Sequence, residues 1–219
     1  MAYIEFRNVH KSFGNNEVLK GINLSIDEGE FVTLLGPSGC GKSTLANLLM
    51  GFWEPTDGHI IIAGEDAATF SEKAVEPSIF PSFSRKSFSL NLSMEENIRI
   101  GKPEASMEEI IAAAKKARIH DFIMSLPNGY QTMAGEAGVK FSGGEKQRIS
   151  IVRMILKDAP IIILDEATAY IDPENEAIVQ KAVSSLVKDK TLIVVAHRLS
   201  TITESSKIVV VNEGRIEAI

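Results

Sequence analysis

The chain has 219 residues, a length that suits one large domain or a core with a subdomain. It is 44% hydrophobic and 24% charged, which are the proportions of a soluble globular protein rather than of a disordered or membrane-embedded one. A net charge of −6 without a Lys/Arg run gives no support to a nucleic-acid-binding surface, and a single cysteine excludes an internal disulfide.

Apolar and polar side chains alternate in the first part of the chain. Residues 3–9 and 22–26 both follow this pattern, and a turn at residues 14–16 lies between them. The pattern is typical of half-buried strands in an antiparallel sheet. Phe13 lies just before the turn, and the residues alone leave two interpretations of it open: a ring that stacks on adenine, or a core residue.

A glycine-rich loop comes after the apolar run at residues 31–35 and before a helical pattern that begins near Lys42. It fits G-x-x-x-x-G-K-[ST], in which glycines let backbone N–H groups point at the β- and γ-phosphates of a nucleotide. The helix dipole and Lys42 add positive charge, and we expect the Ser43 hydroxyl to ligate Mg²⁺. Strand, loop and helix together favour a phosphate site over a turn that binds nothing. The predicted site residues are Gly36, Pro37, Ser38, Gly39, Cys40, Gly41, Lys42, Ser43 and Thr44.

The middle of the chain contains a short strand and a long helical run. We predict a strand at residues 59–62, after a loop at residues 54–58. Residues 66–93 show no sustained period. Residues 105–124 open with acidic residues and carry an apolar stripe, so they are predicted to be helical until residues 127–129 stop the run.

A second glycine-rich segment, Phe141-Ser142-Gly143-Gly144-Glu145, comes before another helical pattern. The apolar stripe of this helix consists of Ile149, Val152, Ile155 and Leu156. Because a helix N-terminus attracts anions, the segment is a second candidate anion site.

Two strongly apolar runs end in polar residues that could take part in chemistry. Residues 161–164 are apolar on both faces, as in a central parallel strand, and end in Asp165 and Glu166. Asp165 suits Mg²⁺ coordination, and Glu166 is the candidate general base for an attacking water. Residues 191–196 end in His197, which could donate a hydrogen bond to a γ-phosphate or be a packed, capping residue.

In this order the motifs resemble the Walker A, signature, Walker B, D-loop and H-loop motifs of an ABC-type ATPase domain. The resemblance covers nearly the whole chain, and the signature loop is its most specific part. It implies an α/β P-loop NTPase fold with a mainly parallel sheet core, an N-terminal antiparallel β-subdomain and a helical subdomain. It also implies one domain over 1–219, with the core and β-subdomain in 1–90 and 159–219 and the helical signature subdomain in 91–158.

The resemblance further implies that ATP and Mg²⁺ lie between two copies arranged head to tail, as a homodimer or heterodimer. The roles that it implies are adenine stacking for Phe13, contact with the partner's γ-phosphate for Ser142, Gly143 and Gly144, water polarisation for Glu166, a γ-phosphate contact for His197 and coupling of the two sites for Asp172. No stretch approaches the roughly 18 apolar residues of a membrane span, and residues 1–5 lack signal-peptide features. We therefore expect membrane-spanning partner segments and a place at the cytoplasmic face of the membrane.

Two features depart from a uniform family pattern. The segment from residue 29 to residue 51 resembles uptake-system ATPases, whereas residues 94–98, 135–138 and 196–201 resemble exporters. The chain is therefore either a chimera joined within residues 60–93 or an exporter-type domain with an unusual first half. In addition, Arg85 stands where the family carries a Gln about eleven residues before its Glu-Asn-Ile element. Either the role of that Gln is lost or Arg85 replaces it, because an Arg cannot ligate Mg²⁺ but can neutralise phosphate charge. We predict that ATP still binds and that turnover is slow.

Two other functions compete with a transport ATPase. One is a non-transport ABC ATPase acting on DNA or ribosomes, but the segment between the two glycine loops is too short for a long coiled coil, and the chain has one ATPase domain. The other is a nucleotide-binding scaffold with little catalysis, which the absent Gln favours.

Overall fold

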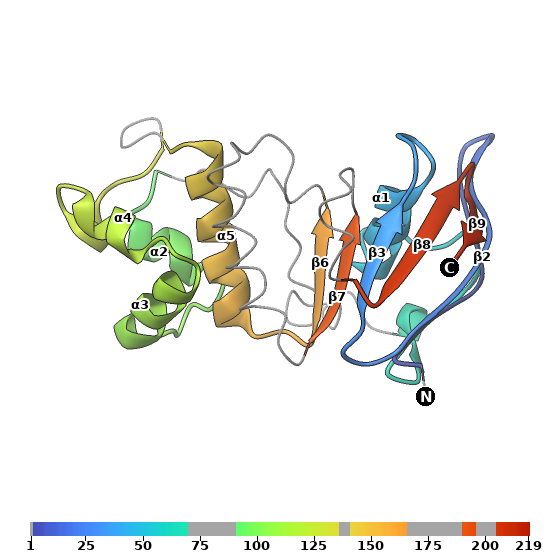
Figure 1. Ribbon diagram of the computed structural model, residues 1–219, viewed down its shortest axis with the longest axis horizontal. Helices are drawn as coiled ribbons and strands as arrows, with labels where there is room; N and C mark the ends of the chain where they lie inside the picture. The colour runs from blue at the N-terminus through green and yellow to red at the C-terminus, as the bar shows by residue number, and fades with distance from the viewer. Residues whose placement is uncertain (1, 70–90, 136–140, 166–189, 196–204) are drawn as a thin grey trace. The chain divides into compact units, whose positions relative to one another are not determined.

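A computed structural model describes residues 2–69, 91–135, 141–165, 190–195 and 205–219 (Figure 1). The chain divides into two compact units. The first contains residues 1–82, 160–166 and 189–219, and the second contains residues 83–159 and 167–188. The subdomain boundaries expected at residues 90 and 159 stay predictions.

The first unit begins with a four-stranded antiparallel sheet in the order β2-β1-β4-β5. Its strands are β1 (Ile4–Phe13), β2 (Asn16–Ile26), β4 (Asp57–Ile62) and β5 (Glu65–Asp66). A short 3₁₀ helix, η1 (Ala67–Thr69), follows β5. Ile4 and Phe6 are buried while Arg7 is exposed, so the alternation in sequence corresponds to two faces of the sheet. The predicted antiparallel opening is confirmed.

The second sheet of this unit has the order β6-β7-β3-β8-β9 and is parallel except for β9. Its strands are β3 (Phe31–Leu35), β6 (Ile161–Asp165), β7 (Thr191–Val195), β8 (Lys207–Asn212) and β9 (Arg215–Ala218). The mainly parallel core is therefore confirmed. Residues 161–164 are buried, yet among the described strands β6 lies at the end of the order rather than in its centre. Apolar residues on both faces of a strand indicate that both faces are covered, but they do not indicate how many strands lie beside it.

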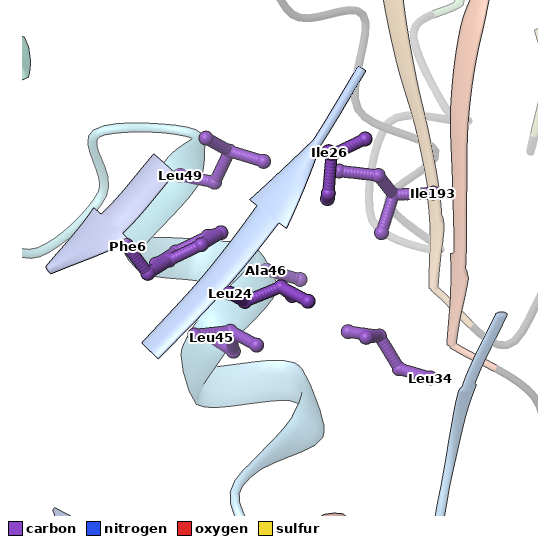
Figure 2. A pocket seen from close by; sticks show the side chains of 8 residues that line it. All are labelled: Phe6, Leu24, Ile26, Leu34, Leu45, Ala46, Leu49 and Ile193. Carbon is purple, nitrogen blue, oxygen red and sulfur yellow. The ribbon is translucent and has the colours of Figure 1, made fainter. Parts of the chain in front are cut away.

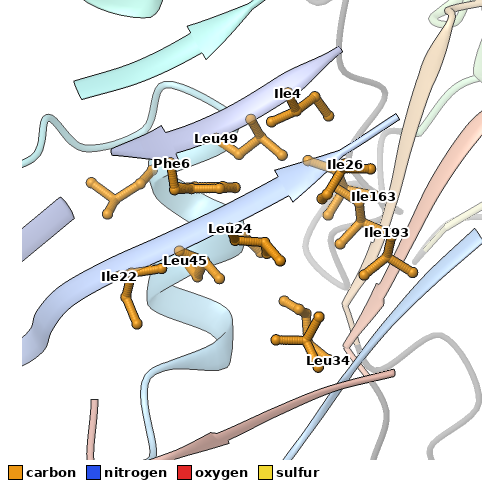
Figure 3. Packing of buried hydrophobic residues seen from close by; sticks show 14 of the residues in the cluster. Ile4, Phe6, Ile22, Leu24, Ile26, Leu34, Leu45, Leu49, Ile163 and Ile193 are labelled. Atoms are coloured by element: carbon orange, nitrogen blue, oxygen red, sulfur yellow. The ribbon is translucent and has the colours of Figure 1, made fainter. Parts of the chain in front are cut away.

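Side chains from both sheets and from helix α1 (Lys42–Leu49) form the core of the first unit (Figure 3). Leu24 and Ile26 of β2 lie against Leu45 of α1 and Ile193 of β7 around a cavity of about 10 Å³ (Figure 2). All of the residues that line the cavity are apolar: Phe6, Leu24, Ile26, Leu34, Leu45, Ala46, Leu49 and Ile193. Such a small apolar space gives a water molecule no hydrogen-bond partner, so we expect it to stay dry.

The described part of the second unit is helical. It contains α2 (Met94–Arg99), α3 (Met107–Lys116), α4 (His120–Ser125), the 3₁₀ helix η3 (Gly129–Gln131) and α5 (Gly143–Lys157). The Arg153 guanidinium of α5 donates to the backbone oxygen of Asn97 at 2.7 Å and to its Oδ1 at 3.1 Å, which joins α5 to α2. Within the described ranges, every helix is too short or too polar to cross a membrane.

The single helical run predicted over residues 105–124 is wrong, because the chain forms two helices there. Arg118 adopts a left-handed backbone conformation with φ of 56°. The N–H of Ile119 donates to the carbonyl of Ala114, and the N–H of Arg118 donates to that of Lys115. These two bonds form a Schellman motif, which ends a helix by satisfying its last carbonyls. The motif usually has Gly where this chain has Arg118, so the break has no local signal in the sequence.

Candidate functional site

Two glycines shape the loop between β3 and α1. A Cβ atom on Gly36 would lie 2.0 Å from the carbonyl oxygen of Val211, so any larger residue would collide with the backbone of β8. Gly41 has φ of 109°, and a Cβ atom there would lie 2.7 Å from Leu19 of β2. The first position therefore needs glycine for space, and the second needs it mainly for its backbone conformation.

The Lys42 ammonium lies inside this loop, and Lys42 as a whole is only 4% exposed. It donates to the carbonyl oxygens of Gly36 at 2.7 Å and Pro37 at 2.9 Å, and lies 3.4 Å from the Cys40 sulfur. Within the described part of the chain, these partners are neutral groups rather than a carboxylate. Because a buried cation is costly without a counter-charge, an anion at the mouth of the loop would be stabilised. The loop therefore fits a phosphate group.

The start of α1 also suits such an anion. Its N-cap is Gly41, which has no side chain to accept a hydrogen bond, and its first turn contains no acidic residue. The first backbone bond into the helix runs from Leu45 N–H to Gly41 O at 2.9 Å. Earlier N–H groups of a helix have no intrahelical acceptor and carry the positive end of the dipole. Ser43, the candidate Mg²⁺ ligand, is exposed in this turn, and Thr44 is half-buried.

Strand register brings Asp165 to the same sheet edge as the loop. Leu34 of β3 pairs with Val195 of β7, and Val195 pairs with Asp165 of β6, all in parallel. Two strand spacings separate the backbones of Leu34 and Asp165, which is about 10 Å. The described residues do not include the Asp165 side chain, Glu166, Asp172, His197 or Arg85, so their site roles stay predictions.

Phe13 is 43% exposed, which excludes the alternative that its ring is a core residue. Its ring lies 4.9 Å from that of Trp53 at an interplanar angle of 78°, and the Lys11 ammonium lies 5.1 Å from its centroid. Neither neighbour was predicted from the sequence. Trp53 is the sole tryptophan of the chain and follows α1 closely, and this was the one available signal.

In the second unit, the predicted signature residues form the start of α5. Ser142 is its N-cap: the Glu145 N–H donates to the Ser142 hydroxyl at 3.3 Å, and the Ser142 N–H donates to the Glu145 carboxylate at 2.6 Å. Ser142 and Gly143 are exposed, whereas Gly144 is buried. This capping box holds the segment as a helix N-terminus and places a carboxylate in its first turn. No role for Glu145 was predicted from the sequence.

A protein-family model described as ABC transporter matches residues 19–169. The chain belongs to the ABC transporter family. The ABC domain is 46% identical over 215 residues to YgaD of Bacillus subtilis (strain 168), which is named as a candidate multidrug export ATP-binding/permease protein. A protein of Staphylococcus aureus (strain NCTC 8325) with the same descriptive name is 47% identical over 215 residues. Both matches cover 97% of this chain and 37% of the relative, so the ABC domain spans less than two-fifths of their length.

A solved structure has the same fold. The ABC domain matches a bacterial Atm1-family ABC exporter with ATP bound, with a TM-score of 0.90 and 39% identity, over 98% of this chain and 38% of that one. The ABC ATPase fold expected from the sequence is therefore confirmed. Because exporter relatives match across both halves of the ABC domain, the similarity does not require a junction within residues 60–93, and the chimera stays a hypothesis.

Proposed function

We propose that this ABC domain binds and hydrolyses ATP to power transport across a membrane, in the manner of an exporter, as a head-to-tail dimer with membrane-spanning partners. One observation carries the ATP part: the buried Lys42 ammonium has only neutral partners described, at the start of a helix whose N-cap lacks a side chain. The names of the relatives and their greater length support the transport part. We place the domain at the cytoplasmic face of the membrane.

Within one copy, different residues bind the base and the phosphates of the nucleotide. Phe13 stacks on adenine. The loop from Gly36 to Thr44 wraps the β- and γ-phosphates, and the Lys42 ammonium moves its hydrogen bonds from carbonyl to phosphate oxygens. Ser43 and Asp165 would hold Mg²⁺, which would neutralise charge on these phosphates.

The remaining roles concern hydrolysis and the partner copy. Glu166 accepts the proton of the attacking water, and His197 donates a hydrogen bond to the γ-phosphate. Ser142, Gly143 and Gly144 of the second copy, identical or related, contact the same phosphate, and Asp172 couples the two sites.

A second candidate function is an ABC domain that binds ATP and hydrolyses it slowly or not at all. Arg85 favours it, because an Arg at the usual Gln position cannot ligate Mg²⁺. A turnover near the median for enzymes, on the order of 10 s⁻¹, would contradict this alternative.

Measurements of Mg-ATP hydrolysis and of ATP-dependent dimerisation, in the wild type and in Glu166→Gln, test the proposal. The variant should lose turnover, and it should dimerise more tightly with ATP because the sandwiched nucleotide is not cleaved. ATP-dependent dimers without turnover in the wild type would select the second candidate. If ATP promotes no dimer in either protein, the composite site is wrong.

A further inference from the structure

We propose that Trp53 and Lys11 are positioning residues for the base: they hold the Phe13 ring in the orientation in which its exposed surface receives adenine. This inference rests on the proposed ATP-binding function and adds to it the two residues that set the base-binding surface. Trp53 and Lys11 are not proposed to touch the phosphates.

Contacts on two sides restrain the Phe13 ring. Trp53 packs against it with an edge-to-face geometry, at 4.9 Å between centroids and 78° between planes. Aromatic pairs favour this arrangement over a face-to-face sandwich. The Lys11 ammonium lies over the ring at 5.1 Å, within the range of a cation–π contact. Phe13 nevertheless stays 43% exposed, so ring surface remains available to a stacking base.

The segment that carries Trp53 is itself fixed to β1. The Lys11 ammonium donates to the carbonyl of Glu54 at 2.7 Å. The N–H of Thr56 donates to the carbonyl of His10 at 2.8 Å, and its hydroxyl accepts from the N–H of Ser12 at 3.0 Å. These three bonds connect residues 54–56 to the end of β1 just before Phe13. The backbone that directly follows Trp53 is therefore held against the end of β1.

Helix α1 connects the segment that carries Trp53 to the phosphate loop. Helix α1 starts at the loop, and the N–H of Phe52 donates to the carbonyl of Asn47 at 3.0 Å at its other end. The loop also packs against β2, because a Cβ on Gly41 would touch Leu19, and Leu19 pairs with Lys11 of β1. Phe13 is two residues beyond Lys11, which is about 7 Å along the strand. The base surface and the phosphate loop are thus parts of one packed structure.

Variants at two adjacent aromatic residues separate positioning from simple surface packing. Trp53→Leu removes the aromatic partner of Phe13, whereas Trp53→Phe keeps an aromatic ring. The matched control is Phe52→Leu, because Phe52 is 60% exposed and has no described ring contact with Phe13, while Trp53 is 38% exposed. Phe13→Ala removes the stacking platform itself.

The assay compares equilibrium binding of Mg-ATP and of inorganic tripolyphosphate with Mg²⁺ to the 219-residue chain. Tripolyphosphate has the phosphates but no base, so a residue that acts on the base changes only ATP affinity. For Trp53→Leu we expect ATP affinity to fall about two- to tenfold, the range for losing an aromatic pair. For Phe13→Ala we expect a loss of about fivefold to a hundredfold, and tripolyphosphate affinity should stay constant in both. Trp53→Phe and Phe52→Leu should bind ATP as the wild type does.

The fluorescence of Trp53 gives a readout that a purely structural role would not change. Because Trp53 is the sole tryptophan, ATP should change the emission of the wild type, and tripolyphosphate should leave it unchanged. Equal losses of ATP and tripolyphosphate affinity in Trp53→Leu would overturn the inference, since they would report damage to the whole domain. Wild-type ATP affinity in Trp53→Leu together with a selective loss in Phe13→Ala would overturn only the inference. If the wild type bound neither Mg-ATP nor tripolyphosphate, the proposed function would instead be refuted.

Discussion

Replacing Glu145 by Gln should strengthen ATP-dependent dimerisation while it weakens the fold. In the wild type, the Glu145 carboxylate accepts the N–H of Ser142 at 2.6 Å in the first turn of α5. That turn is the proposed contact for the partner's γ-phosphate, so a negative charge lies beside the place where another negative charge must arrive. A glutamine side chain keeps an acceptor oxygen for Ser142 and removes the charge.

The expected loss of stability follows from the capping box. A charged acceptor forms a hydrogen bond roughly twice as strong as a neutral one, and an acidic side chain near a helix N-terminus contributes about 0.3–1 kcal/mol through the dipole. The amide retains part of the first contribution and none of the second. We therefore expect Glu145→Gln to lower the free energy of unfolding by about 1 kcal/mol, or a melting temperature by about 2–4 °C for a domain of this size.

The expected gain in dimerisation follows from Coulomb's law. Two unit charges one helical turn apart, about 5.4 Å, repel each other by about 0.8 kcal/mol in water and by about 3 kcal/mol at an effective dielectric constant of 20. Glu145 keeps part of its surface in solvent, which screens its charge, so the lower figure is used as the minimum. Because a symmetric dimer has two such sites, relief of at least about 1.5 kcal/mol should make the ATP-bound dimer about tenfold tighter.

Sedimentation equilibrium with ATP in the Glu166→Gln background measures the dimer, and chemical unfolding measures stability. The control is Glu96→Gln, because Glu96 forms the same two capping bonds with Ser93 at the start of α2. The control should lose stability and leave dimerisation unchanged. Tighter dimers in the control as well, or weaker dimers in Glu145→Gln, would refute the electrostatic reasoning.

Three further predictions concern the first unit. Gly36→Ala should abolish ATP binding in a titration, because its Cβ would lie 2.0 Å from the Val211 carbonyl oxygen. Leu24→Ala should enlarge the core cavity and lower the free energy of unfolding in urea by about 3–5 kcal/mol. Lys207→Met should remove the 2.7 Å ion pair with Glu30. Burial raises the pKa of Glu30, but the Lys207 contact and a backbone N–H outweigh it and lower that pKa. A carboxylate whose pKa is lowered by folding stabilises the fold at pH values above the pKa that it has in the unfolded chain. The difference in free energy of unfolding between Lys207→Met and the wild type should therefore shrink as the pH falls below about 4.

The sequence predicts the strands well because their signal is local. Alternation at residues 22–26 and the uniform apolar run at residues 161–164 each report burial of one or both faces. The break between α3 and α4 had no such signal. The hydrogen bonds of a Schellman motif decide it, and Arg118 provides neither the Gly nor the Pro that usually marks a helix end.

The same distinction applies to the site. The phosphate loop is predictable because its residues are adjacent in sequence and its glycines report backbone shape. Trp53 and Lys11 are not, because their contacts with Phe13 depend on how residues 53–56 return to β1. Residues that bind through the backbone can be found from a motif, whereas residues that hold a side chain in place become visible only in three dimensions.

The two proposed phosphate-binding helix ends differ in a way that implies an order of events. Helix α1 begins at Gly41 with no capping side chain and no acidic residue in its first turn, and the Lys42 ammonium beside it has only neutral partners described, so this end suits an anion. Helix α5 begins with Ser142 and Glu145 already bonded to each other, so its donors are partly satisfied and its dipole is partly neutralised. A triphosphate should therefore bind first at α1 of one copy and only afterwards recruit α5 of the other. On this reasoning Glu145→Gln changes the second step alone: the dimer becomes tighter, while the affinity of a single copy for ATP stays that of the wild type.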